Sequence, residues 1–384
     1  MKFKLATSAV AVAVAFAALA CLMGTASAQI KVGIITGASG PGASLGIPYK
    51  NTFAATPNTL GGEPVTYIVV DDATDPANAA RLARKLITED KVDLIIGSGN
   101  VPTASSISFV ASETKTPQIA LSPLSGEPAK NPWVFSMSLP TSLQMGAVAD
   151  HIKAKGAKTV GYIGFSDSWG DQVYTALTAH APAAGFSVTT NERYARLDTS
   201  VTSQALKVVS SRPDVVVLGG SGTPGALPHT TLVERGYKGQ IYHSAAVVNP
   251  EFLKIGGKAL EGALVSAGPV VVAEQLPDSN PVKKQGLEFT KAYEAKYGPG
   301  TRNSFSAYSW DAYLLADRAV AVAKTKAKPG TPEFRQALRD ALEATKDLAG
   351  AQGVYTMSPT DHAGADKRAV VLLRVENGGW KLAN

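Results

Sequence analysis

Cysteine is nearly absent from this sequence of 384 residues, and histidine is scarce. The one cysteine, Cys21, lies in an N-terminal segment that we expect to be removed, so disulfides, thiolate metal sites and cysteine nucleophiles are excluded from the mature chain. The histidines show no spacing typical of metal ligands, and we predict neither a metal ion nor a cofactor. There are five of them: His151, His180, His229, His243 and His362.

Long apolar runs are missing too, apart from one between Ala9 and about Met23 that is short for a membrane span. A basic N-terminus precedes this run and an Ala-Ser-Ala cleavage site follows it, which is the pattern of a secretory signal peptide. We predict that residues 1–28 are cleaved after Ala28 and that the mature protein lies in the periplasm. A retained membrane anchor and a lipid on Cys21 are alternatives, but the residues before Cys21 match a lipobox poorly.

Runs of basic residues are also lacking. The formal net charge is +6, and it falls to +4 once Lys2 and Lys4 are removed with the signal peptide. This small excess is spread along the chain without an aromatic and basic module, so we expect no nucleic-acid partner. Because 45% of the residues are hydrophobic and 18% are charged, the chain can bury a large core and is long enough for two domains.

Predicted strands and helices alternate through the mature chain, which indicates doubly wound α/β layers with parallel sheets. The first strand is expected at 31–36. Nearer the C-terminus, we expect residues 270–277 to be extended and 306–323 to form an amphipathic helix with its aromatic residues in the core. One face of that helix carries Trp310, Tyr313, Leu314 and Ala321. The tail, 369–380, predicts a β-hairpin that turns at Asn377-Gly378.

The stretch 92–106 is the most informative. A short apolar run bounded by two glycines predicts a buried strand that ends in a tight turn. A helix should follow, with Asn100 or Val101 as its N-cap, Pro102 at its first position, and the Thr103 hydroxyl in its first turn. Free backbone N–H groups and the positive end of the helix dipole would make this turn a seat for a carboxylate or a phosphate.

The same order of elements repeats further along the chain. The matching segments are 158–164 with 31–35, 212–222 with 91–99, and 239–244 with 116–122. A single long repeat of this kind indicates two similar lobes, not a solenoid. Ligands of open α/β sheets bind at the carboxyl ends of the strands, so two such edges facing one another predict a binding cleft.

Together these features resemble the periplasmic leucine/isoleucine/valine-binding proteins, which are solute receptors of ABC transporters. The resemblance spans essentially the whole mature chain. It is carried by Gly40-Pro41 after the first strand, Asp71-Asp72 with Pro76, Ile96-Gly97, Ser122-Pro123, and Ser304 to Asp311 before Tyr313.

The resemblance implies the type I periplasmic-binding fold, in which two doubly wound Rossmann-like lobes are joined by a three-segment hinge. The expected linking segments are Leu139–Thr141, Ser266–Val271 and Tyr355–Thr360. The first lobe would then comprise 29–140 plus 272–356, and the second lobe 141–271 plus 357–384. It further implies a monomer that closes around a small-molecule ligand and presents the closed state to an inner-membrane ABC permease.

The resemblance also implies where the ligand binds. The family's carboxylate seat falls on Asn100–Thr103 and on 124–126 after Ser122, its apolar wall falls on Leu45, and its aromatic lid falls on Trp169. In the second lobe the assisting tyrosine of the family falls on Ser221, and the acid that binds an α-ammonium falls on Ala245 or Ala246. The predicted ligand-binding residues are Leu45, Asn100, Val101, Pro102, Thr103, Ser122, Leu124, Ser125, Trp169, Ser221, His243 and Ala245.

Two enzyme motifs are present only in part. Gly42-Ala-Ser44-Leu-Gly46 matches a serine-hydrolase elbow in letters, but several residues separate it from the end of the preceding strand. The Gly97-x-Gly99 turn lacks the third glycine of a dinucleotide site, where Pro102 stands. We therefore predict that the protein is not an enzyme.

The missing acid defines the predicted ligand. No carboxylate lies between Tyr242 and Pro250, and burying an ammonium without a partner costs several kcal/mol. We therefore predict a transport receptor for a small carboxylate without an α-ammonium, an aromatic acid of the benzoate or hydroxybenzoate type. Trp169 would stack on its ring, and His243 or Ser221 would meet a para-hydroxyl.

Two alternatives remain at this stage. A branched-chain amino acid would fit if Asp167, on the loop before Trp169, supplied the missing acid. A ligand-sensing module of a signalling protein is the other alternative, but such a module is normally followed by a membrane segment and an output domain, and neither precedes Asn384.

Overall fold

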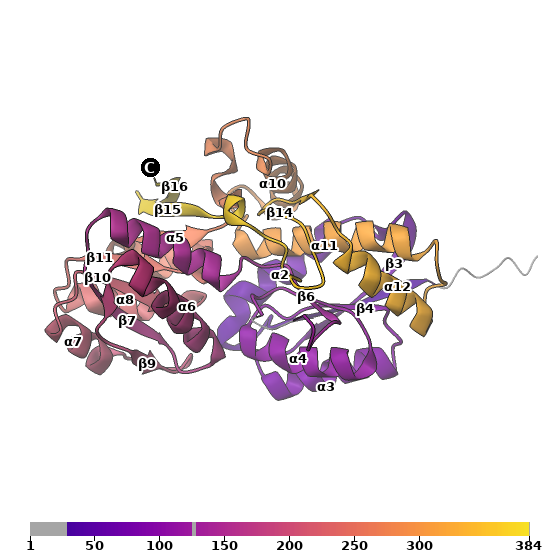
Figure 1. The fold of residues 1–384 in the computed structure, drawn as a ribbon, viewed down its shortest axis with the longest axis horizontal. Coiled ribbons are helices and arrows are strands. Elements are labelled where there is room, and N and C mark those ends of the chain that lie inside the picture. Colours follow the sequence, from indigo (N-terminus) through magenta and orange to yellow (C-terminus); the bar gives the residue numbers. More distant parts are fainter. Residues whose placement is uncertain (1–28, 125–127, 384) are drawn as a thin grey trace, which may run out of the picture.

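The computed structural model describes residues 29–124 and 128–383. These residues form two α/β lobes that lie side by side (Figure 1). The predicted signal peptide at 1–28, with Cys21, and the predicted site residue Ser125 lie outside the described residues. None of the helices in the described ranges has the length and apolar character needed to cross a membrane.

The first lobe is built on a six-stranded sheet with the order β2-β3-β1-β4-β5-β6. All neighbouring strands are parallel except β2 and β3, which form an antiparallel pair. The strands are β1 (Ile30–Thr36), β2 (Thr59–Leu60), β3 (Glu63–Asp71), β4 (Leu94–Gly97), β5 (Gln118–Ala120) and β6 (Val134–Ser136). Strand β4 is buried along its whole length, as expected of a parallel strand covered on both faces.

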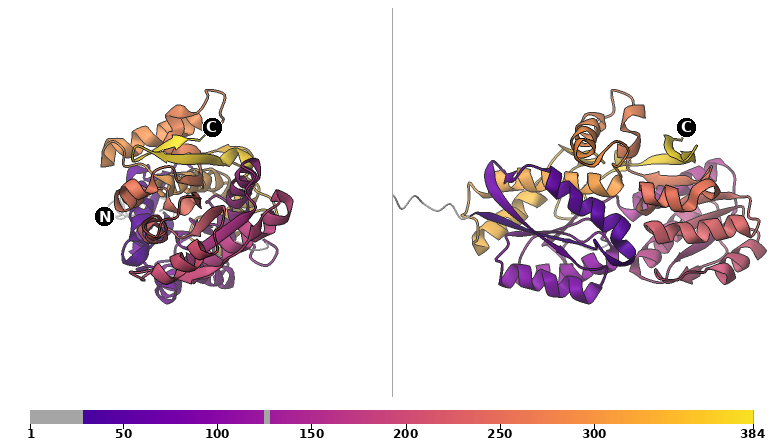
Figure 2. Two further views of the ribbon diagram at one scale, coloured as in Figure 1. Left: turned by 90° about the vertical axis from the view of Figure 1, so that its left-hand side faces the viewer. Right: turned by 180° about the vertical axis from the view of Figure 1, so that it is seen from behind.

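Helices cover both faces of this sheet. Helices α3 and α4 pack against each other on one face, and α2, α11 and α12 lie on the other (Figures 1 and 2). The elements are η1 (Gly40–Gly42), α2 (Ala43–Ala55), α3 (Pro76–Thr88), α4 (Val101–Thr114), α10 (Lys283–Tyr297), α11 (Ser304–Ala323) and α12 (Pro332–Glu343), with the small hairpin β13 (Leu348–Ala349) and β14 (Val354–Tyr355). Asp75 caps α3 by accepting from Asn78 N, and Pro76 is its first residue.

The second lobe has an eight-stranded sheet with the path β16-β15-β12-β11-β10-β7-β8, and β9 also pairs with β7. The central strands are parallel, whereas β15 and β16 are antiparallel. The strands are β7 (Thr159–Phe165), β8 (Ser187–Val188), β9 (Glu192–Tyr194), β10 (Val215–Gly219), β11 (Gln240–His243), β12 (Leu264–Ala267), β15 (Val371–Glu376) and β16 (Gly379–Leu382). The predicted hairpin is confirmed, and both turn residues, Asn377 and Gly378, have positive φ.

The second lobe is likewise layered, with α5 packed on α6 and α7 packed on α8. Its helical elements are α5 (Thr141–Ala154), α6 (Ser168–Ala184), α7 (Thr202–Ser210), η2 (Thr223–Gly225), α8 (Ala226–Glu234), η3 (Ala245–Val247), α9 (Pro250–Gly256), η4 (Gly257–Leu260) and η6 (Lys367–Ala369). The predicted α/β class with two doubly wound lobes is therefore confirmed.

Two local predictions are wrong. Residues 270–277 are not extended, because Pro269–Gln275 forms the 3₁₀ segment η5. The three valines that suggested a strand are instead buried where the chain passes between the lobes, so tertiary packing overrides their β-propensity. In α11, Tyr313 is buried and Trp310 and Leu314 pack against the core as predicted, but Ala321 is exposed.

The chain passes between the two sheets near two of the three expected linking segments. The chain leaves the first sheet after β6 and enters α5 at Thr141, and it leaves β12 for η5 next to the first lobe. The third expected segment, Tyr355–Thr360, does not yet lead to the second lobe. His362, further along, still binds the first lobe, since its Nδ1 lies 2.9 Å from Val134 O and Ser136 N donates to its carbonyl.

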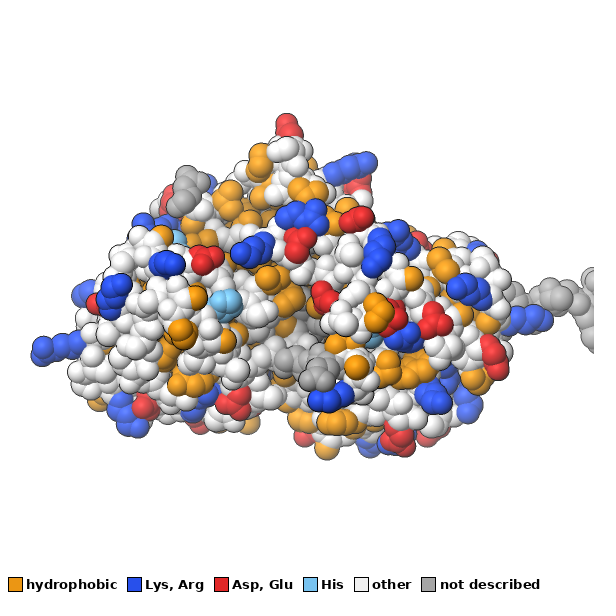
Figure 3. All heavy atoms as spheres, in the orientation of Figure 1, with side chains coloured by type: hydrophobic (Ala, Val, Ile, Leu, Met, Phe, Trp, Pro, Cys, Tyr) orange, Lys and Arg blue, Asp and Glu red, His pale blue; other side chains and the backbone are white. Residues whose placement is uncertain are grey.

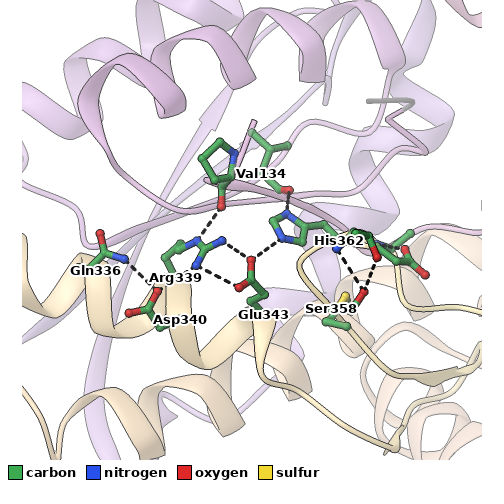
Figure 4. Close-up of polar contacts among 12 residues, drawn as sticks. Val134, Gln336, Arg339, Asp340, Glu343, Ser358 and His362 are labelled. Carbon is green, nitrogen blue, oxygen red and sulfur yellow. Dashed lines mark hydrogen bonds and ion pairs between the residues drawn. The ribbon is translucent and has the colours of Figure 1, made fainter. Parts of the chain in front are cut away.

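Figure 4 shows why this segment stays on the first lobe. His362 Nε2 lies 3.1 Å from a carboxylate oxygen of Glu343 on α12, and Arg339 on the same helix pairs with Glu343. The His362 ring also stacks on Phe135 of β6 with 4.1 Å between centroids. We therefore place the third connection after residue 365, and the lobe boundaries given above stay a prediction.

Candidate functional site

A cavity lies between the lobes, at the carboxyl ends of the strands in both sheets. It is lined by residues of the segments that directly follow β4, β5, β6, β7, β9, β10 and β11 and by residues of α2, α5 and α11. These residues are Leu45, Tyr49, Gly99, Asn100, Val101, Leu121, Ser122, Pro123, Ser138, Gln144, Trp169, Arg196, Ser221, Ala245, Ala246, Phe305 and Tyr308.

The structure brings most of the predicted site residues to this cavity. Those that line it are Leu45, Asn100, Val101, Ser122, Trp169, Ser221 and Ala245. Those that do not line it are Pro102, Thr103, Leu124 and His243. The local pattern of each strand end and helix start therefore located the cavity, whereas the orientation of individual side chains separates the two groups.

The first-lobe wall of the cavity is the start of α4. Asn100 is the N-cap, as predicted, and Pro102 is the second helical residue instead of the first. The Asn100 side chain makes no capping hydrogen bond, because its Oδ1 accepts from Arg196 Nη1 at 3.3 Å. Its Nδ2 and the hydroxyl of Ser122 are buried without a partner among the described residues. Buried donors of this kind are normally paired with an acceptor.

Three residues predicted to bind the ligand from the first lobe do not line the cavity. Pro102 and Thr103 follow Asn100 into the helix, and the helical rotation carries their side chains away from the cavity. Thr103 is buried, with its hydroxyl donating to Asn100 O at 2.9 Å. Leu124 packs against the second-lobe core and lines a wider hollow between the lobes, part of which is visible in Figure 3.

His243, which was also predicted to contact the ligand, does not line the cavity. Its side chain is fully buried in the second lobe, where its Nε2 lies 2.9 Å from His229 Nδ1. The residue is the last of β11, and alternation along a strand turns its ring away from the cavity while the loop that follows supplies Ala245. Burial lowers the pKa of His243 well below its usual value, so the imidazole is neutral.

Trp169 both lines the cavity and belongs to the second-lobe core. Its side chain is 4% exposed, and its Nε1 donates to Gly220 O at 3.2 Å. Asp167 caps helix α6 by accepting from the backbone N–H groups of Trp169 and Gly170. The indole is therefore a fixed wall, with its backbone anchored by one carboxylate and its ring by one carbonyl.

Sequence reasoning missed Arg196, the one charged side chain among the described residues that line the cavity. Its Nε donates to Asp167 Oδ2 at 2.6 Å, and its guanidinium lies over the Phe165 ring, 4.3 Å from the centroid. Its Nη1 donates to Ser221 Oγ at 2.9 Å as well as to Asn100. Arg196 follows the short strand β9 in an irregular loop, where no motif or periodicity marks it.

Three further missed residues come from α2 and α11, helices that are far apart in sequence. Tyr49, Phe305 and Tyr308 add an aromatic wall. Tyr49 donates to Leu121 O at 2.7 Å, and Phe305 meets its ring edge-on with 5.5 Å between centroids. Gly99 lets this wall approach, because a Cβ there would lie 2.1 Å from the Tyr49 ring. The other missed residues are Leu121, Pro123, Ser138, Gln144 and Ala246.

The two lobes touch beside the cavity. Thr223 N donates to Ser44 Oγ at 3.2 Å, and Gln172 Nε2 donates to Pro123 O at 2.7 Å. Gly222 permits the first contact, since it has φ of +57° and a Cβ at this position would lie 2.5 Å from Ser44 Oγ. Within the described ranges, no group of three or more His, Cys, Asp or Glu side chains is placed to hold a metal ion.

Known proteins of similar structure and sequence agree with this architecture. An extracellular ligand-binding receptor from Rhodopseudomonas palustris is 44% identical, with a TM-score of 0.91 over 93% of this chain and 100% of that chain. A solute-binding protein of an ABC transporter from R. palustris, solved in complex with benzoate, is 22% identical, with a TM-score of 0.79 over 93% of this chain and 96% of that chain.

In sequence, the Leu/Ile/Val-binding protein homolog 3 of Brucella melitensis is 26% identical over 90% of this chain and 92% of its own length. These similarities confirm the resemblance to the leucine/isoleucine/valine-binding proteins. A family model described as a periplasmic binding protein matches residues 29–379, and the chain therefore belongs to this family of solute receptors that serve ABC transporters.

Proposed function

We propose that this receptor binds a small aromatic carboxylate, of the benzoate or hydroxybenzoate type, in the cavity between its lobes and passes it to an inner-membrane ABC permease. The observation that carries the proposal is the charge of the cavity wall. Among the described lining residues there is no Asp, Glu, Lys or His, and the only charged group is the Arg196 guanidinium. Such a wall favours an anion.

The same wall disfavours an amino acid. An α-ammonium buried here would meet a guanidinium and no free carboxylate, and an unpaired buried charge costs several kcal/mol. Asp167 is not free to supply the missing acid. Its Oδ1 accepts from two backbone N–H groups of α6, and its Oδ2 accepts from Arg196.

The first-lobe side of the cavity offers donors for a carboxylate. Asn100 Nδ2 and Ser122 Oγ are buried and lack partners among the described residues. Ser122 follows strand β5, and Asn100 is the N-cap of α4, a helix of 14 residues whose first backbone N–H groups and dipole add positive potential. A ligand carboxylate would pair both donors, which removes the cost of leaving them buried and unpaired.

The rest of the cavity suits an aromatic ring. Tyr49, Trp169, Phe305 and Tyr308 line it, and stacked or edge-on contacts between such rings stabilise a complex beyond the area they bury. Ser221 Oγ and Asn100 Oδ1 both accept from Arg196 Nη1. Ser221 therefore belongs near the carboxylate end of the ligand and not beside a para-hydroxyl. Ser138 and Gln144 are further polar residues of the lining.

The names of the similar proteins support a ligand that carries a carboxylate, but they differ in the kind of ligand. One protein of this fold is described in complex with benzoate, so the fold can hold an aromatic acid. The Brucella melitensis relative is named for leucine, isoleucine and valine, which favours a branched-chain amino acid as the second candidate. The absence of an acid among the described lining residues is our reason for ranking the aromatic acid first.

A thermal-shift panel tests the proposal on mature protein that begins at Gln29. The panel contains benzoate, hydroxybenzoates, phenylpropanoids, dicarboxylates and the branched-chain amino acids. A ligand at about a hundred times its dissociation constant should raise the free energy of unfolding by about 2.7 kcal/mol. Stabilisation by aromatic acids alone is expected, and stabilisation by leucine or valine with silent benzoates would refute the aromatic assignment.

A further inference from the structure

Arg196 connects the two halves of the cavity. It extends from the loop after β9 in the second lobe, and its Nη1 reaches Asn100 Oδ1 of the first lobe at 3.3 Å. The other atom of the same amide, Asn100 Nδ2, is buried and lacks a partner among the described residues. The guanidinium therefore stands one side chain away from the proposed carboxylate seat.

The guanidinium is held in place on two sides. Asp167 Oδ2 accepts from its Nε at 2.6 Å, and the Phe165 ring lies under its plane, 4.3 Å from the central carbon. Its hydrogen bonds to described residues use Nε and Nη1, which leaves Nη2 for a ligand oxygen. A planar fork fixed in this way can bind a carboxylate without first losing side-chain freedom.

We infer that Arg196 is the second-lobe half of a carboxylate clamp, an inference that rests on the proposed function. One ligand carboxylate would accept from Asn100 Nδ2 and Ser122 Oγ in the first lobe and from the Arg196 guanidinium in the second. Because the two sets of donors come from different lobes, the negative charge of the ligand would hold the two lobes together. Arg196 is then a specificity-determining residue, which makes closure depend on an anion and rejects neutral analogues of the same shape.

Asp167 has a positioning role in this clamp. The same carboxylate caps the helix that carries Trp169 and holds the Nε of Arg196, so the ring wall and the charged group are fixed relative to each other. This coupling explains why an acid stands close to a site for an anion. The Asp167 carboxylate orients the guanidinium through its Nε edge and leaves another edge of the guanidinium for the ligand.

Calorimetric titration of benzoate and of its neutral analogue benzamide tests the clamp. Wild-type protein should bind benzoate at least about a hundredfold more tightly than benzamide, because only the anion pairs with a desolvated guanidinium. Arg196→Gln should lose at least about a hundredfold in benzoate affinity and change little toward benzamide, so that the preference disappears. Arg196→Lys, which keeps the charge and loses the planar fork, should show an intermediate loss of about tenfold.

Arg193→Gln is the matched control. Arg193 lies in the same lobe, pairs with Asp171 at 3.0 Å, and lies over two tyrosine rings, yet it does not line the cavity. This variant should keep both affinities. Circular dichroism and thermal melting of each variant separate a loss of binding from a loss of folding.

The outcomes distinguish the clamp from the proposed function. Benzoate binding that survives unchanged in folded Arg196→Gln would overturn the clamp and leave the aromatic-acid receptor standing. Wild-type protein that binds leucine and not benzoate, with leucine binding lost in Arg196→Gln, would overturn the aromatic assignment and support the clamp, since leucine also carries a carboxylate. Equal binding of benzoate and benzamide by the wild type would contradict both.

Discussion

His229 and His243 form a buried pair in the second lobe, with Nδ1 of the first 2.9 Å from Nε2 of the second. Their rings are nearly parallel, with 5.2 Å between centroids, and Phe252 meets the His243 ring edge-on. Burial lowers the pKa of His229 to about 4, although a hydrogen bond to the Ala259 backbone opposes the shift. Burial, and then the nearby His229, lower the pKa of His243.

This pair predicts a loss of stability in mild acid. Both imidazoles are neutral in the folded protein, whereas in the unfolded chain they take up protons below about pH 6.5. As the pH falls from about 6.5 toward 4, the unfolded state binds more protons, and the free energy of unfolding should fall by up to about 1.4 kcal/mol per pH unit for each histidine. Above about pH 6.5 both histidines are neutral in the folded and in the unfolded protein, so the free energy of unfolding no longer depends on their protonation.

Urea unfolding between pH 5 and 8, combined with NMR titration of the imidazole signals, measures this effect. The signals of His229 and His243 should stay in the neutral form at pH 5.5. If both titrate near pH 6.5 in the folded protein, the buried neutral pair is not present in solution.

Trp169→Ala should weaken both folding and binding. The indole is part of the second-lobe core, and deleting a buried Trp costs about 3–5 kcal/mol of stability. It also forms one wall of the cavity, so affinity for an aromatic acid should fall by about 1–3 kcal/mol. Melting curves and calorimetric titration measure the two effects separately.

Phe186→Ala is the control for that variant, because Phe186 is buried in the same core and does not line the cavity. It should lose stability and keep its affinity. An equal loss of affinity in both variants would mean that general loosening of the lobe, and not the indole wall, weakens binding.

Asp311→Ala should destabilise the protein without touching the cavity. The buried Asp311 carboxylate accepts from Ala351 N at 2.6 Å, Gln352 N at 3.0 Å and the Tyr355 hydroxyl at 2.7 Å. Each buried donor left unpaired costs about 1–3 kcal/mol, so the free energy of unfolding should fall by about 3 kcal/mol or more. Urea unfolding measures the loss.

The neighbouring contacts extend this prediction to the linking segment. Gln352 Oε1 accepts from Val270 N at 3.3 Å, where the chain crosses between the lobes. Asp311→Asn keeps one acceptor oxygen and should lose less stability than Asp311→Ala. If the two variants unfold at the wild-type urea concentration, the carboxylate does not hold this segment.

Export should remove residues 1–28. The basic N-terminus, the apolar run and the Ala-Ser-Ala site together predict cleavage after Ala28 and a mature chain that begins at Gln29. Intact-mass spectrometry of the exported protein measures the N-terminus directly. A mass that corresponds to a diacylglyceryl-modified Cys21 would refute the predicted cleavage.

Much of the fold could be predicted because its signals are local. Alternating strands and helices, the turn before α4 and the Asn377-Gly378 hairpin each depend on residues that are neighbours in sequence. The position of a loop at the end of a parallel strand also follows from this order, since all such ends lie on one edge of a sheet. This order predicted a ligand at the turn that contains Asn100, and the resemblance to the family extended the prediction to Ser122, Trp169 and Ser221, which also line the cavity.

Only the tertiary structure decided which side chains make up the cavity and what charge it carries. His243 was predicted to contact the ligand and is buried beside His229, because the direction of a side chain at a strand end depends on the register of the sheet. Arg196 and the aromatic wall of Tyr49, Phe305 and Tyr308 come from distant segments that no local pattern connects. A sequence specifies backbone elements through interactions over a few residues, whereas a binding site is specified by packing between elements far apart in the chain. That packing alone brought the guanidinium of Arg196 to the cavity wall.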